Sequence, residues 1–174
     1  MSDVTNSPLP SQLWKRLSEE RRFAAAEGLW RDPDAVAEQG ELLGTIAQRI
    51  KFRIKSVVEM SVEKKARYVV ALPTVSDFTA ARLLVIYHVV YQRPMMRRFL
   101  DALEISHEDG MILDEEFATL PQERLASAAS TLASVFPAED VSLYLSTLIW
   151  QDPETWGGLA GLPQVGTPSV PSAK

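Results

Sequence analysis

The sequence contains no cysteine, and this absence removes several classes of site at once. Disulfide bonds, zinc–thiolate centres, iron–sulfur clusters and thiol nucleophiles all require cysteine sulfur. Histidine is nearly as scarce, with only His88 and His107 in 174 residues. The G-x-S-x-G, Walker, dinucleotide-binding and H-E-x-x-H patterns are absent too. We therefore expect no cofactor, and we favour a non-enzymatic function over an enzymatic one.

Long hydrophobic runs are also missing. The longest apolar stretch, residues 83–91, is about half of the roughly 20 residues that a membrane-spanning helix needs, and Arg82 and Arg93 flank it. The first residues, MSDVTNSPLP, have neither a basic start nor an apolar core, so they do not resemble a signal peptide. We expect a cytoplasmic protein with no membrane partner.

The composition is otherwise that of a globular protein. Hydrophobic residues make up 46% of the chain and charged residues 24%, both close to the average for soluble domains. A length of 174 residues suits one domain with a sizeable core. We expect a mobile N-terminus at residues 1–9, an all-α domain at residues 10–160, and a disordered Pro/Gly/Ser-rich tail at residues 161–174.

The segment from Ser76 to Tyr91 organises the expected fold. It begins with cap-type residues, its second half is apolar or aromatic except at His88, and Pro94 follows its end. A helix that is apolar on all sides must be covered on all sides. The pattern predicts an all-α fold, a single-domain irregular bundle of seven or eight helices around this buried central helix.

Two other features of this region bear on that expectation. The runs YVVAL and LLVIYHVVY are rich in β-branched and aromatic residues, so strands within residues 65–91 are an open alternative. Helix length, the caps and the lack of a Gly-containing tight turn between the runs favour helices. Earlier in the chain, Asp32 and Pro33 are typical of a helix start. We interpret Gly40 and Gly44, one turn apart in the helix that follows, as a point of close helix–helix approach.

Charge is distributed unevenly along the chain. Between Arg49 and Arg67 there are seven basic residues against two acidic ones, a net charge of +5. Between Asp101 and Trp156 twelve acidic residues stand against one basic residue, a net charge of −11. The seven basic residues are Arg49, Lys51, Arg53, Lys55, Lys64, Lys65 and Arg67.

This asymmetry supports three interpretations. In the first, the basic half of one molecule docks on the acidic half of another copy or of an unknown protein, which predicts an adaptor domain that self-associates, for example as a homodimer. In the second, the basic segment with Phe52 and Tyr68 binds phosphates, which predicts a nucleic-acid-binding regulator. In the third, the basic side chains only solvate the outer faces of two helices. Of the two interpretations that give the segment a function, we favour the first.

Two weaker hypotheses concern the histidines and the loop ISHEDGMILDEE. A small enzyme would need a pocket centred on His88 or His107, with Asp109 and Glu116 as candidate carboxylates. The loop fits a calcium-loop template at Asp109, Gly110, Ile112 and Glu116. Ile105 and His107, however, occupy two positions where the ion needs oxygen ligands, so we expect no metal.

Overall fold

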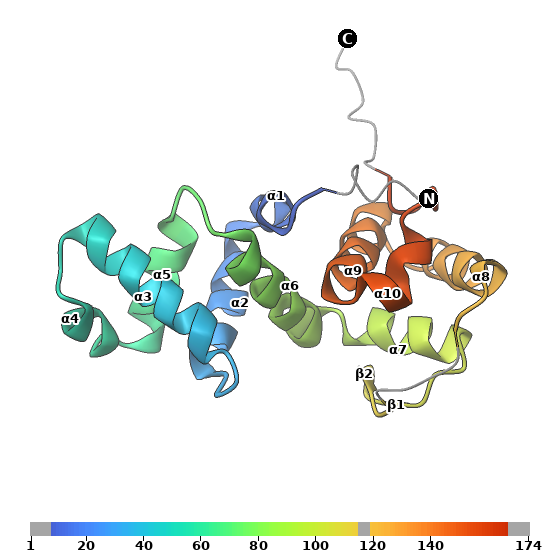
Figure 1. Cartoon of the computed structure of the whole chain (residues 1–174), viewed down its shortest axis with the longest axis horizontal. Helices are drawn as coiled ribbons and strands as arrows, with labels where there is room; N and C mark the ends of the chain where they lie inside the picture. The colour runs from blue at the N-terminus through green and yellow to red at the C-terminus, as the bar shows by residue number, and fades with distance from the viewer. Residues whose placement is uncertain (1–7, 115–118, 167–174) are drawn as a thin grey trace, which may run out of the picture. The chain divides into compact units, whose positions relative to one another are not determined.

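The computed structural model describes residues 8–114 and 119–166 (Figure 1). Within these ranges the chain is all-α, as predicted, with ten α-helices, one 3-10 helix and one two-stranded hairpin. The helices gather into two compact units: an N-terminal unit of residues 9–91, and a C-terminal unit that starts at Gln92 and includes Pro8. The single domain expected for residues 10–160 therefore spans two units, and each has its own core.

The N-terminal unit consists of six helices. They are α1 (Pro10–Arg16), α2 (Glu19–Arg31), α3 (Val36–Ile50), α4 (Ile54–Val58), α5 (Val62–Ala71) and α6 (Asp77–Tyr91). Serine caps start two of them: Ser18 accepts the backbone N–H of Arg21 at 3.3 Å and Ser61 that of Lys64 at 3.2 Å.

The expected central helix is α6, and it is helical throughout, which excludes the strand alternative for residues 77–91. The hydroxyl of Ser76 accepts the backbone N–H of Thr79 at 3.2 Å at its start. The helix packs against α1, α2 and α3 and buries residues that include Leu83, Leu84 and Tyr87. Its cover is incomplete, because Phe78 and Val90 are 56% and 52% exposed.

The start of α3 differs from the expectation. The helix begins at Val36, after Ala35, and has no side-chain cap. The carboxylate of Asp32 instead accepts the backbone N–H of Asp34 at 2.9 Å and pairs with Arg82 on α6 at 2.8 Å. The polar turn at Asp32 therefore anchors the α2–α3 connection to α6 and does not open the next helix.

The interpretation of Gly40 and Gly44 as contact points is wrong. A Cβ built on either glycine meets nothing within 4 Å, so both lie on an open side of α3. The close approach occurs at Gly28 on α2, where a Cβ would lie 2.6 Å from Cγ2 of Ile86 on α6. A glycine pair marks a possible contact, but only the packing decides which glycine is used.

Alanine substitutions should separate these two kinds of glycine. Gly40→Ala is expected to raise the free energy of unfolding by about 0.5–1 kcal/mol, because it adds helix propensity without a clash. Gly28→Ala is expected to lower it, since the new methyl group overlaps a branched, buried side chain. Urea unfolding followed by circular dichroism measures both; equal effects of the two substitutions would contradict the close α2–α6 contact.

The C-terminal unit combines four α-helices with a small hairpin. Its elements are α7 (Arg93–Ala102), β1 (His107–Glu108), β2 (Met111–Ile112), α8 (Gln122–Ala133), α9 (Ala138–Gln151), α10 (Pro153–Trp156) and the 3-10 helix η2 (Gly157–Leu159). Phe99 lies at the centre of its core, with the rings of Tyr144 and Trp156 at 5.6 and 5.7 Å. Burial raises the pKa of the Tyr144 phenol above its ordinary value.

The predicted tail begins inside this unit. Val165 is buried, and its carbonyl accepts the hydroxyl of Ser142 at 3.4 Å, so residues 161–166 are part of the packed structure. The other residues expected to be mobile or disordered, 1–7 and 167–174, lie outside the described residues. The helices outnumber the expected seven or eight because α1, α4 and α10 have only seven, five and four residues. No helix in the described ranges is both long enough and apolar enough to cross a bilayer.

Candidate interaction surface

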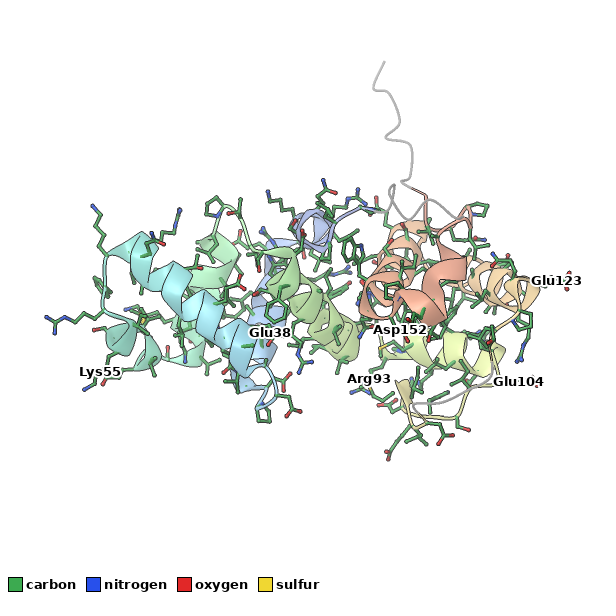
Figure 2. The ribbon with its side chains drawn as sticks, in the orientation of Figure 1. Glu38, Lys55, Arg93, Glu104, Glu123 and Asp152 are labelled. Atoms are coloured by element: carbon green, nitrogen blue, oxygen red, sulfur yellow. The ribbon has the colours of Figure 1, made fainter. Side chains whose placement is uncertain are left out.

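Four of the seven predicted basic residues lie close together where α3 gives way to α4. α3 ends because Lys51 adopts the left-handed conformation, with φ 57° and ψ 38°, and the N–H of Phe52 donates to the carbonyl of Ala47 at 3.0 Å. Arg53 is extended, and α4 then runs for five residues. Figure 2 shows Lys55 projecting outward from α4.

This segment also exposes large apolar side chains. Phe52, Ile54 and Val58 are 54%, 56% and 49% exposed, and Val57 is the one buried residue of α4. Ile54 and Val58 are four residues apart and therefore share one face of the helix. Exposed apolar side chains that gather in one place are typical of contact sites. We call residues Arg49, Lys51, Phe52, Arg53, Ile54, Lys55 and Val58 the basic–apolar surface.

The cations of this surface lack counterions in the part of the chain that the structure describes. Arg49, Lys51, Arg53 and Lys55 are all exposed, and none of them forms an ion pair with any residue that the structure describes. Their positive charge is therefore available to an acidic partner.

The other three predicted basic residues lie on α5 and differ in their contacts. Lys65 Nζ lies 4.8 Å from the ring centroid of Trp30, and Arg67 pairs with Glu63 at 2.6 Å. Lys64 and Arg67 line an open groove of about 520 Å³ that also contains Glu63. A second groove, of about 820 Å³, brings Arg67 near Glu19 and Glu20. The carboxylates in both grooves oppose the binding of phosphate.

The loop tested against the calcium template is a tight β-hairpin. His107 pairs with Ile112 and Glu108 with Met111, and Asp109 and Gly110 form the turn with φ of 49° and 86°. An Asp-Gly pair at two positive φ values is the strongest short sequence signal for such a turn, and that signal marks the hairpin here. The Asp109 carboxylate pairs with Arg97 on α7 at 2.6 Å, and the Asp109 backbone carbonyl accepts a hydrogen bond from Nη1 of Arg93 at 2.8 Å. Asp109 is thus held by arginines.

His107 is tied into the same hairpin. Its Nδ1 accepts the backbone N–H of Gly110 at 3.1 Å, which leaves Nε2 to donate to the Asp101 carboxylate at 2.8 Å. Both ring nitrogens have partners within the chain. This arrangement orients the ring for structure and leaves no lone pair for a substrate proton.

The other members of the predicted polar site lie elsewhere or outside the described residues. His88 belongs to the N-terminal unit, where it is buried and its Nδ1 donates to the carbonyl of Leu84 at 2.7 Å. Burial lowers its pKa to about 4. Glu116 lies outside the described residues. Among the residues that are described, no three His, Asp or Glu side chains are grouped so as to hold a metal ion.

The hairpin depends on Gly110, and this can be tested. Gly110→Ala is expected to lower the free energy of unfolding by more than about 1 kcal/mol, because φ is 86° and the new Cβ would lie 2.8 Å from that of Met96. Gly157→Ala is the control, since φ there is −56° and nothing lies within 4 Å. Urea denaturation of both variants measures the difference; equal stability would show that the hairpin does not contribute to the fold.

A second exposed apolar group, which sequence reasoning missed, lies on the hairpin. Met111, Ile112 and Leu113 are 45%, 38% and 59% exposed. The exposed carboxylates of Glu108 and Asp114 flank them in the chain, and Glu108 pairs with Met111 across the two strands. We call residues Glu108, Met111, Ile112, Leu113 and Asp114 the hairpin surface. The sequence signal was the run MIL followed by an acid, directly after the Asp-Gly turn.

The N-terminal unit thus exposes a cationic apolar surface, and the C-terminal unit exposes an acidic apolar one. Comparisons with family models, curated proteins and solved structures find no match, so the function is argued from these residues.

Proposed function

We propose that the chain is a non-enzymatic helical protein-interaction domain that acts as an adaptor in the cytoplasm and contacts its partner through the basic–apolar surface. The observation that carries the proposal is the exposure of Phe52, Ile54 and Val58 beside four exposed cations that form no ion pair with a described residue. Burying apolar area supplies affinity. Charges around it steer an acidic partner and select it.

A nucleic-acid-binding regulator is the second candidate, because the same four cations surround Phe52. Three facts make it the weaker one. The α5 cations Lys65 and Arg67 already contact Trp30 and Glu63. Carboxylates line the grooves beside α5. Two of the three exposed apolar side chains are aliphatic and do not stack on bases as aromatic rings do.

The proposal is tested by comparing two matched double variants of the tagged protein. Phe52→Ser/Ile54→Ser removes exposed apolar groups from the basic–apolar surface. Phe78→Ser/Val36→Ser removes the same kinds of side chain, 56% and 69% exposed, elsewhere on the N-terminal unit. Each is used to capture partners from native lysate, read by mass spectrometry and by nucleic-acid absorbance.

We expect a stoichiometric protein partner with the wild type and with the Phe78/Val36 control, and its loss with the Phe52/Ile54 variant. Nucleic acid that elutes at about 0.2–0.5 M salt would contradict the proposal and support the regulator, since counterion release makes such binding salt-dependent. A partner retained by the Phe52/Ile54 variant would also contradict it.

A further inference from the structure

We propose that the partner of the basic–apolar surface is the hairpin surface of a second copy of this chain. This inference rests on the proposed function and names the occupant of the same surface. The first surface exposes Phe52, Ile54 and Val58. The second exposes Met111 and Leu113 on one side of its strand and Ile112 on the other side. The first is bordered by four cations and the second by the carboxylates of Glu108 and Asp114.

The pairing of the neighbouring acids shows which carboxylates are available. Asp109 is bound by Arg97, Asp101 by His107, and Glu104 by Arg124 at 2.9 Å. By contrast, Glu108 and Asp114 form no ion pair with any described residue. Within residues 101–114, Glu108 and Asp114 are thus the two carboxylates without a side-chain partner among the described residues, and both border the exposed apolar group, where they could meet Lys51, Arg53 and Lys55.

The hairpin is held in place before it meets a partner. Arg93 and Arg97 fasten its turn to α7, His107 bridges Asp101 and the N–H of Gly110, and Gly110 packs against Met96. The N–H of Leu113 donates to the carbonyl of Ser106 at 3.2 Å and extends the ladder past β2. Fixing the side chains in advance reduces the entropy lost on binding.

The two surfaces differ, so the contact is heterologous. A copy that docks through its hairpin surface still presents its own basic–apolar surface to a third copy. Such contacts close into rings or continue as open chains. Self-association should therefore grow with protein concentration, and added salt should weaken it because the charges lie at the surface.

Charge reversal with exchange provides the test, with full-length protein studied by sedimentation velocity at low salt. Variant A is Lys51→Glu/Arg53→Glu, and variant B is Glu108→Lys/Asp114→Lys. Variant A cancels the positive charge of the basic–apolar surface and places two carboxylates opposite Glu108 and Asp114, whereas variant B places two ammonium groups opposite the four cations. For each alone we expect at least about a tenfold rise in the dissociation constant. In an equimolar mixture every A–B contact again joins opposite charges, so association should return.

Two control variants carry the same change of net charge at other exposed positions. Lys15→Glu/Arg16→Glu matches variant A, and Glu41→Lys/Glu139→Lys matches variant B. Both should associate like the wild type. A wild-type monomer at every concentration would overturn the inference, and so would a mixture of A and B that stays monomeric.

The failure of this inference is separable from that of the proposed function. If the mixture stays monomeric while Phe52→Ser/Ile54→Ser still loses a captured protein, the surface binds a different acidic protein and only the self-association falls. If variant A alone releases nucleic acid that the wild type carries, both proposals fall.

Discussion

Replacing Leu84 with Ala is expected to lower the free energy of unfolding by about 2–5 kcal/mol. Leu84 is 1% exposed on α6, the helix against which α1, α2 and α3 pack. Removing most of its side chain loses the free energy gained by burying apolar area. It also leaves a cavity, which the tightly packed neighbours fill only in part. Urea denaturation followed at the helical circular dichroism signal measures the loss.

Val90→Ala on the same helix is the matched control for Leu84→Ala. Val90 is 52% exposed, so its truncation should change stability by less than about 0.5 kcal/mol. Because Leu84 belongs to the core of the N-terminal unit, the Leu84 variant should unfold residues 9–91 at a lower urea concentration than the wild type. An unchanged midpoint would contradict the role of α6 as the centre of that unit.

The centre of the fold was predictable because local chemistry and burial agree there. Ser76 offers a cap, the second half of the helix is apolar or aromatic except at His88, and Pro94 follows its end. The β-branched residues did not convert this segment to a strand, since α1, α2 and α3 supply the burial that a helix of this kind needs. The helix caps at Ser18 and Ser61 were predictable as well, because each hydrogen bond joins residues only three apart in the sequence.

What depends on distant packing was not predictable. Periodicity shows that a face is apolar, but it does not show whether another element covers it. The basic segment was visible in the sequence. Its sequence did not show that Lys65 and Arg67 on α5 contact Trp30 and Glu63, whereas the cations of residues 49–55 form no ion pair with a described residue. The choice of Gly28 over Gly40 likewise depends on where Ile86 of α6 lies.

The hairpin surface was missed for a different reason. The loop was tested for calcium ligands, which drew attention to its carboxylates, while the Asp-Gly turn signal and the run Met111 to Leu113 carried the structural information. Arg93 and Arg97 lie 12 or more residues before Asp109. No local pattern predicts that they would bind its turn.

Acid should destabilise the protein through His88. Burial lowers the pKa of its imidazole from 6.5 to about 4 in the folded protein, and the unfolded chain keeps the ordinary value. Between these values the unfolded state binds a proton that the folded state does not. The contribution of neutral His88 to the free energy of unfolding is therefore complete above pH 6.5. As the pH falls toward 4, about 3 kcal/mol of it is lost.

The comparison of wild type with His88→Gln isolates this contribution. Gln keeps an N–H donor for the carbonyl of Leu84 but takes up no proton, whereas carboxyl groups such as Asp152 titrate in both proteins and cancel. Unfolding free energies measured at pH 7 and pH 4 should fall by about 3 kcal/mol more in the wild type than in the variant. Equal losses would mean that the pKa of His88 is the same in the folded and unfolded protein, which would contradict the effect of burial on its imidazole.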